Sequence, residues 1–142
     1  MSDTRLTPYL SFKDSKTKEA MEFYHGIFGG ELKLQTFGDT PMDFPDEKKH
    51  LIMHASLQGG GADLFASDGP KDEDYVAGTN VSISITGSDE AELRKYFDGL
   101  SEGGTVGQPL EKQFWGDLFG MVTDQYGIHW MVNVGTGGMG SA

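Results

Sequence analysis

The stretch QFWGDLFGMVTDQYGIHWMVNV, residues 113–134, decides the fold, because it has the pattern of two β-strands joined by a tight turn. Apolar residues occupy every second position from Ile128 to Val134, which is the spacing of a strand with two different faces. Asp124 and Gly127 bound the turn, and Gly127 can adopt the positive φ that such turns require. Five large aromatic residues lie in this hairpin, so we expect it to form the wall of a core or of a pocket.

The segments before this hairpin follow a pattern that occurs twice in the chain. In the first half, Leu10 and Phe12 alternate with Ser11 as in a strand, and an amphipathic helix that ends at Gly30 follows. The residues of this strand and of the apolar helical face each have a counterpart 73 positions later. The pairs are Leu10 and Ile83, Phe12 and Ile85, Ala20 and Leu93, Phe23 and Tyr96, Tyr24 and Phe97, Ile27 and Leu100, and Gly30 and Gly103.

The hairpins of the two halves also match, but at a different interval. Met53 and Met121 lie 68 positions apart, as do Gly59 and Gly127. The first half therefore contains a few extra residues, and the proline-containing loop between residues 38 and 49 has room for them.

Each half predicts the order strand, helix, strand, strand, strand. We expect an α+β fold of two βαβββ modules, at about residues 7–67 and 79–134, with a linker at about 68–78 and a flexible tail at 135–142. One such module cannot bury both faces of its sheet. Two modules with curled sheets and outer helices enclose a cavity, so we expect residues 1–142 to form one domain around a ligand site.

The helix starts carry recognisable capping residues. We expect Ser15 or Thr17 to cap the first helix and Ser88 the second, because a side-chain oxygen can accept from the free N–H groups of a first turn. Asp89 and Glu90 suit the positive end of the second helix dipole.

Composition excludes several classes of partner. The formal net charge is −11, which disfavours nucleic acids and anionic membranes. The chain has no cysteine, so it forms no disulfide and performs no thiol chemistry. Neither an apolar signal core nor a run of membrane-spanning length is present, so we expect a soluble, cytoplasmic protein.

Several motifs give the chain a family resemblance. These are PYLSF at residues 8–12, EAMEFY at 19–24, HASL at 54–57, FWGD at 114–117, FGMVTD at 119–124 with Gly127, and WMVN at 130–133. The chain resembles the vicinal oxygen chelate superfamily of glyoxalases, bleomycin resistance proteins and dioxygenases. Within it, the chain is similar to the PhnB-like group, also described as 3-demethylubiquinone-9 3-methyltransferase-like. The resemblance covers roughly Thr7 to Val134 and implies paired βαβββ modules and a homodimer, but the superfamily hosts many chemistries.

The resemblance also implies where a metal would bind. The metal enzymes of the superfamily place His, Gln or Glu at four strand positions, which correspond here to Tyr9, Asp63, either Asn80 or Ser82, and Met131. Only Asp63 is a good ligand for a divalent metal, and a stable site needs three or four. We therefore expect no metal and no other cofactor.

Two polar residues are candidates for acid/base chemistry. His54, if it faces the cavity, can act as a general base, or it can be a core histidine bonded to the backbone. Asp63 can be a cavity carboxylate or a solvated hairpin residue. His129 shares its strand face with Met131. If His54 and His129 both face one cavity, they can form an alternative, non-classical metal site with Asp63. His25 and His50 favour exposed structural roles.

Large aromatic residues are candidates for ligand contacts. Trp115, Phe119, Trp130 and Phe12 can line a pocket or simply pack in the core, and Trp115 is the first choice. With Tyr9, Asn80, Ser82, His129 and Met131, they form the predicted ligand-binding set.

Three functional hypotheses follow. The first is a metal-independent protein that binds a small organic molecule in an aromatic-lined cavity. The second is an enzyme of the lyase, isomerase or hydrolase type that uses His54 and Asp63. The third is an interaction protein whose cavity is filled by its own side chains.

Overall fold

A computed structural model describes residues 3–68 and 75–135. The chain divides into two compact units, Met1–Val76 and Ala77–Ala142. Residues 69–74 of the predicted linker and 136–142 of the predicted tail lie outside the described residues. Within the described ranges, no helix is both long and apolar enough to cross a membrane.

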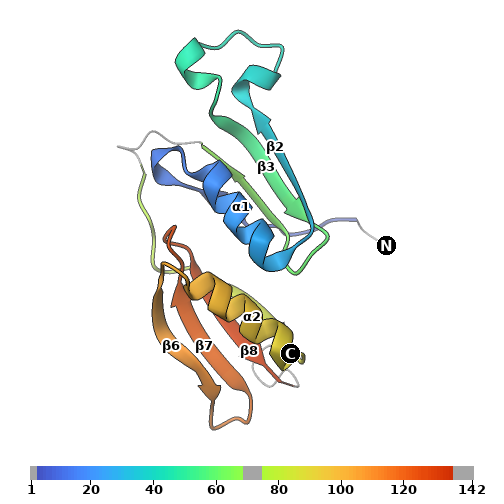
Figure 1. Cartoon of the computed structure of the whole chain (residues 1–142), viewed down its shortest axis with the longest axis vertical. Coiled ribbons are helices and arrows are strands. Elements are labelled where there is room, and N and C mark those ends of the chain that lie inside the picture. Colours follow the sequence, from blue (N-terminus) through green and yellow to red (C-terminus); the bar gives the residue numbers. More distant parts are fainter. Residues whose placement is uncertain (1–2, 69–74, 136–142) are drawn as a thin grey trace. The chain divides into compact units, whose positions relative to one another are not determined.

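Unit 1 is a four-stranded sheet with one long helix against it (Figure 1). The strands are β1 (Tyr9–Ser11), β2 (Glu31–Thr36), β3 (Ile52–Gln58) and β4 (Leu64–Ser67), and the helix is α1 (Thr17–Phe28). The sheet order is β1-β4-β3-β2, in which β1 runs parallel to β4 and the other pairs are antiparallel. Short 3-10 helices lie at Lys13–Ser15, Phe37–Asp39 and Asp46–Lys48.

Unit 2 repeats this arrangement. Its strands are β5 (Ile83–Gly87), β6 (Thr105–Lys112), β7 (Leu118–Thr123) and β8 (His129–Val134), and its helix is α2 (Glu90–Ser101). The order is β5-β8-β7-β6, with β5 parallel to β8. The predicted α+β class with two βαβββ modules is therefore confirmed.

The apolar face predicted for α2 is confirmed, whereas the face predicted for α1 is displaced. Leu93, Tyr96, Phe97 and Leu100 are all buried. In α1, Ala20 and Tyr24 are buried as expected, but Phe23 and Ile27 are half-buried, and Met21 and Phe28 take their place in the core. Apolar residues lie on more than one face of α1, so their spacing alone did not define which face packs against the sheet.

The start of α1 differs from the prediction. Neither Ser15 nor Thr17 caps the helix through its side chain. Instead, the carboxylate of Asp68, at the end of β4, accepts from the backbone N–H of Thr17 at 3.2 Å and from that of Ile52 at 2.8 Å. One carboxylate from a distant part of the chain thus joins α1 and β3, which local capping rules cannot reveal.

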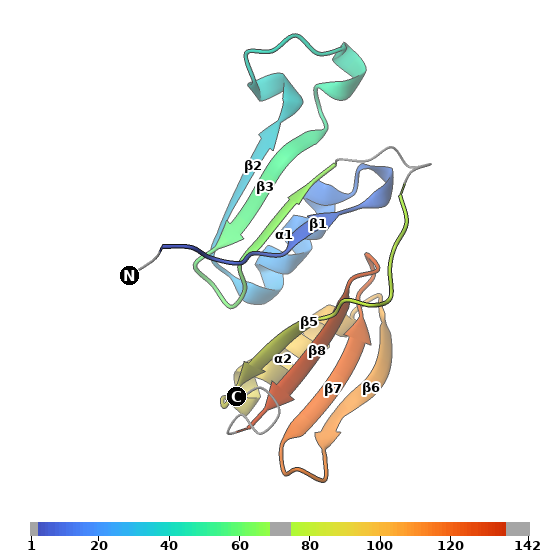
Figure 2. The ribbon, with the colours of Figure 1, turned by 180° about the vertical axis from the view of Figure 1, so that it is seen from behind.

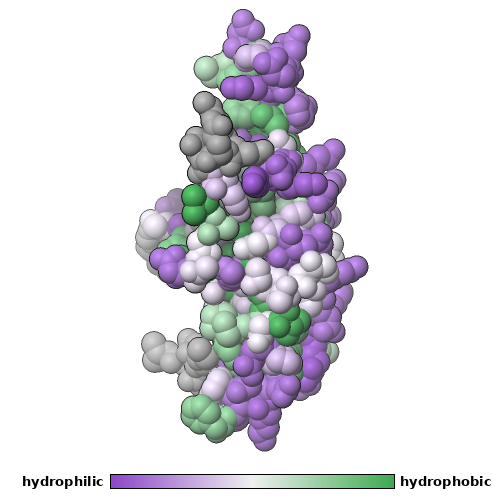
Figure 3. Space-filling view, turned by 90° about the vertical axis from the view of Figure 1, so that its left-hand side faces the viewer, coloured by the Kyte–Doolittle hydropathy of each residue, from purple (hydrophilic) through white to green (hydrophobic). Residues whose placement is uncertain are grey.

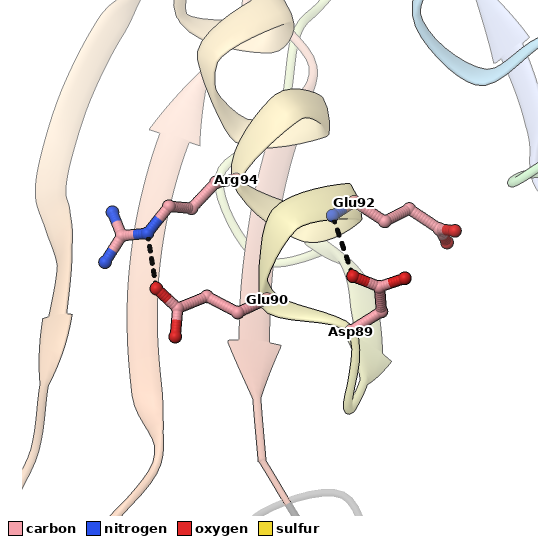
Figure 4. A network of polar contacts seen from close by, with 4 residues as sticks. All are labelled: Asp89, Glu90, Glu92 and Arg94. Carbon is pink, nitrogen blue, oxygen red and sulfur yellow. Dashed lines mark hydrogen bonds and ion pairs between the residues drawn. The ribbon is translucent and has the colours of Figure 1, made fainter.

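The start of α2 is capped one residue later than predicted. Asp89, not Ser88, is the N-cap, and its carboxylate accepts from the N–H of Glu92 at 3.1 Å (Figure 4). Arg94 donates to Glu90 at 2.9 Å one turn along the helix. Burial raises the pKa of the Tyr96 hydroxyl on the inner side of α2, and the nearby charge of Glu92 adds to the rise.

The predicted interval of 68 positions between the hairpins fails for Met53 and Met121, whereas Gly59 and Gly127 both have a positive φ, of 87° and 86°. The pairing between β2 and β3 shifts at Gln35 and Thr36, whose partners are His54 and Ile52, so Met53 is an inserted bulge residue. Met121 instead pairs with Met131 in a regular ladder. The bulge reverses the alternation in β3, so the match of Met53 with Met121 was wrong.

The final hairpin has the predicted turn, with Gly127 at a φ of 86°. A buried carboxylate organises it. Asp124 accepts from the N–H groups of Tyr126 at 2.8 Å and Ile128 at 3.1 Å, and from the indole N–H of Trp130 at 2.8 Å. The turn and the buried indole are therefore held by one side chain.

Gly120 lies where β7 passes under α2. A Cβ at this position would be 2.7 Å from a ring carbon of Phe97 and 3.0 Å from the Cα of Leu110. Both neighbours are buried, so the contact between helix and sheet depends on the missing side chain.

We predict that Asp68→Ala lowers the free energy of unfolding of unit 1 by about 2 kcal/mol, because two backbone donors lose a charged acceptor. Urea denaturation followed by circular dichroism measures the change. Asp43→Ala, at an exposed position of the same unit, is the control and should change stability little. Equal stability of the two variants would contradict the capping role of Asp68.

We also predict that Gly120→Ala destabilises unit 2 by about 1–3 kcal/mol through overpacking against Phe97. Gly107→Ala is the matched strand control, because its Cβ would meet only the carbonyl oxygen of Met121 at 3.8 Å. Thermal unfolding of both variants checks this. A Gly120→Ala protein as stable as Gly107→Ala would show that α2 can move away from β7 without cost.

Candidate functional site

Each unit has one sheet face that its own helix does not cover. In Figure 2, each sheet is drawn in front of its own helix. We call these surfaces open face A, in unit 1, and open face B, in unit 2. In the view of Figure 3, hydrophilic residues cover much of the surface and apolar residues form small separate patches.

The centre of open face A is a cluster of three rings. Tyr9 on β1 and Phe65 on β4 are directly paired, and His54 lies on β3. The ring centroid of His54 is 5.1 Å from that of Phe65 and 5.7 Å from that of Tyr9. The hydroxyl of Tyr9 lies 3.2 Å from Nδ1 of His54. The structure thus brings together two predicted residues, Tyr9 and His54, and adds Phe65.

Among the described residues, His54 has a hydrogen bond at Nδ1 and none at Nε2. Nδ1 and the Tyr9 hydroxyl form one hydrogen bond, in which either atom can be the donor. His54 is half-buried, and Tyr9 is 53% exposed. This arrangement can hold the imidazole in one orientation while Nε2 meets a ligand or a proton.

Asp63 does not join this cluster. Leu57 pairs with Leu64, which places Asp63 beside Gln58. Gln58 is four residues from His54 along β3, or about 13 Å. The Asp63 carboxylate instead accepts from the N–H of Gly59 at 3.3 Å and lies 3.8 Å from Arg5. His54 and Asp63 are therefore too far apart for direct proton transfer between them, and their acid/base roles stay a prediction.

Open face B carries large apolar side chains. Phe119 and Met121 on β7 and Met131 on β8 share this face, because Val122, Trp130 and Val132 between them are buried on the other. The ring of Trp115 meets the ring of Phe119 edge-on, with centroids 5.8 Å apart. Met121 is 41% exposed. The face therefore combines two rings with two flexible thioethers.

A buried polar pair borders these apolar groups. Asn133, 2% exposed, is the cross-strand partner of Phe119, and its Nδ2 donates to the carboxylate of Asp117 at 3.0 Å. Asp117 is also buried, and a Cβ at Gly135 would collide with its carboxylate. The pair is fixed in place by its surroundings.

His129 has a structural role on the edge of open face B. Its Nε2 donates to the carbonyl of Gly78 at 3.1 Å, because a carbonyl can only accept. Its Nδ1 then accepts from the Thr123 hydroxyl at 2.9 Å. Both nitrogens are used, which argues against His129 as a metal ligand. Asn80 and Ser82 lie before β5 and are exposed.

Two of the predicted ligand-binding residues are core residues instead. Trp130 is 1% exposed and bonded to Asp124, and Phe12 is 3% exposed and packs near Tyr24 of α1. Both rings are enclosed on the helix side of their sheets, away from the open faces. Each is a correction to the prediction.

The remaining histidines lie outside both clusters. His25 donates from Nε2 to the carbonyl of Gly30 at 3.1 Å and so supports the end of α1. His50 is exposed in the turn before β3. In residues 3–68 and 75–135, no three His, Asp or Glu side chains gather as a metal site requires. The absence of a metal stays a prediction.

Phe65, Met121, Asn133 and Asp117 are site residues that the sequence analysis did not select. Strand alternation around Phe119 and Met131 could have indicated Met121 and Asn133. The roles of Phe65 and Asp117 depend on cross-strand neighbours that periodicity does not show.

Comparisons with known proteins agree on the family. The model of the family described as 3-demethylubiquinone-9 3-methyltransferase matches residues 4–133. Protein YjdN of Escherichia coli is 31% identical over 144 residues, covering 91% of this chain and 94% of that protein. Protein Rv0887c of Mycobacterium tuberculosis is 33% identical over 134 residues, covering 88% of this chain and 71% of that protein.

Solved structures share the fold. Protein PA1353 of Pseudomonas aeruginosa has a TM-score of 0.78 at 39% identity, covering 93% of this chain and 98% of that one. A PhnB protein of Bacillus cereus has a TM-score of 0.72 at 24% identity, covering 93% and 100%. A glyoxalase/bleomycin resistance protein/dioxygenase superfamily member from Sphaerobacter thermophilus shows the fold at 18% identity and a TM-score of 0.53, covering 93% and 98%. The chain therefore belongs to the family described as 3-demethylubiquinone-9 3-methyltransferase.

Proposed function

We propose that this protein binds a small organic molecule of aromatic or apolar character on open face B. The observation that carries the proposal is the presence of Trp115, Phe119, Met121 and Met131 on a sheet face that α2 does not cover. Covering apolar surface contributes about 25 cal/mol for each Å² removed from water. A ligand that rests on these side chains therefore gains binding energy.

The side-chain types suit such a ligand. The rings of Trp115 and Phe119 present flat surfaces in a fixed edge-on pair. Met121 and Met131 pair across β7 and β8, and unbranched thioethers adapt to ligands of different outline. Ligand sites are mostly apolar with a few polar groups, and Asn133 and Asp117 supply the polar border.

The family description names a methyl transfer. The residues of this chain support that reaction less than they support the binding of a ligand. A nucleotide-like methyl donor is often held by a glycine-rich turn between a first strand and a helix. Here β1 is followed by Lys13–Ser15 and α1, and residues 12–17 contain no glycine. We therefore propose binding rather than methyl transfer as the function of open face B.

A second candidate function rests on His54. We propose that this imidazole transfers protons through Nε2 and that Tyr9 positions the ring through its bond to Nδ1. This role does not need Asp63.

The homodimer implied by the family resemblance also stays a proposal, which light scattering coupled to size-exclusion chromatography tests.

For the first function, we predict that Met121→Asp weakens the binding of quinoline at least tenfold, because it puts a charge on the apolar face. Titrations followed by ¹⁵N NMR measure affinity and location, with shifts expected in β7 and β8. Val106→Asp is the matched control, since Val106 is 43% exposed and Met121 41%. The proposal fails if quinoline, naphthalene and 2-quinolinone all leave the spectrum of the wild type unchanged.

For the second, we predict that diethyl pyrocarbonate, which modifies uncharged imidazole, reacts with His54 faster than with His129, whose two nitrogens are bonded. Mass spectrometry of digested protein gives each rate. Tyr9→Phe should change the rate at His54 severalfold and leave exposed His50 unaffected. If His54 reacts as slowly as His129, its Nε2 is not available and this candidate is wrong.

A further inference from the structure

Two buried polar atoms on or beside open face B have no hydrogen-bond partner in the part of the chain that the structure describes. They are Nε1 of Trp115 and Oδ1 of Asn133. A third such atom, Oγ1 of Thr17, belongs to α1 in the other unit. A buried donor or acceptor without a hydrogen bond costs about 1–3 kcal/mol of stability. Two such atoms near one surface therefore need an explanation.

The orientation of the Asn133 amide is determined by its neighbour. Its amide nitrogen donates to the carboxylate of Asp117 at 3.0 Å. A carboxylate accepts hydrogen bonds, so the nitrogen and not the oxygen must face it. Oδ1 is therefore directed elsewhere, and it can be satisfied only by a donor.

The requirement at Trp115 is the opposite. An indole N–H can donate and cannot accept. Its nitrogen is buried, although the residue as a whole is only half-buried. Nε1 therefore needs an acceptor.

Phe119 connects the two positions. Asn133 is its cross-strand partner, and the Trp115 ring contacts it edge-on at 5.8 Å. The residue that lacks an acceptor and the residue that lacks a donor are thus both neighbours of Phe119. A water molecule can satisfy such groups in the free protein, but a ligand that displaces the water loses affinity unless it replaces both bonds.

We propose that the ligand of open face B carries an acceptor for Trp115 and a donor for Asn133 on the edge of a flat apolar body. A lactam or cyclic amide has this chemistry, because its C=O accepts and its N–H donates. This inference rests on the proposed function and adds the class of ligand to it.

Three bicyclic probes of nearly equal size test the proposal. 2-Quinolinone carries both groups, quinoline carries an acceptor only, and naphthalene carries neither. We expect 2-quinolinone to bind at least tenfold more tightly than naphthalene, with quinoline between them, because each hydrogen bond adds a severalfold gain. Titrations followed by ¹⁵N NMR report affinity and position together.

Trp115→Phe removes the donor and keeps a ring beside Phe119. It should abolish the preference for quinoline over naphthalene and retain the part of the 2-quinolinone preference that Asn133 provides. Val106→Ala, at an exposed position that pairs with Val122 on the other side of the sheet, is the control and should leave all three affinities unchanged. Asn133→Val should abolish the remaining preference, but it strands the Asp117 carboxylate, so Trp115→Phe remains decisive if that variant does not fold.

The outcomes separate the inference from the proposed function. If all three probes bind open face B equally well, the ligand class is wrong and the proposed function stands. A preference for 2-quinolinone that survives Trp115→Phe in full also overturns the inference. If no probe binds, the proposed function fails as well.

Discussion

One helix can cover only one face of a four-stranded sheet, and the rest of this structure depends on that constraint. In each unit, strand alternation sends one set of side chains toward the helix and the other set to an open face. Leu57, Leu64 and Ala66 are therefore buried behind α1, and Trp130 and Val132 behind α2. Their immediate neighbours in sequence, such as Phe65 and Met131, lie on the opposite side. The candidate functions follow from what each open face contains.

Three aspartates accept hydrogen bonds near the ends of the strands. Asp68 joins the first turn of α1 to β3, Asp124 joins the final turn to the indole of Trp130, and Asp117 receives the amide of Asn133. A short carboxylate can accept several hydrogen bonds at once, so it satisfies backbone or side-chain donors that would otherwise be buried without a partner. Because the Asn133 nitrogen donates to Asp117, the Asn133 oxygen faces away from Asp117 and can bind only a donor.

The two open faces differ although the units share one topology. Open face A has an aromatic cluster with an imidazole whose second nitrogen is available, which suits proton transfer. Open face B has thioethers, rings and two buried polar atoms without a described partner, which suits the recognition of a flat ligand. One topology thus presents two different surfaces, because function depends on the side chains that a scaffold carries and not on the scaffold itself.

The sequence by itself determined the two βαβββ units, the face of α2, the Gly127 turn and the family, because these depend on local periodicity and on motifs of contiguous residues. It also selected Tyr9, His54, Trp115, Phe119 and Met131, which the structure places in the two clusters. Only the tertiary structure decided that Asp68 caps α1, that Met53 is a bulge, that Trp130 belongs to the core, and that Asp63 lies far from His54. The physical reason is that strand register and long-range hydrogen bonds join residues whose separation in sequence carries no periodic signal.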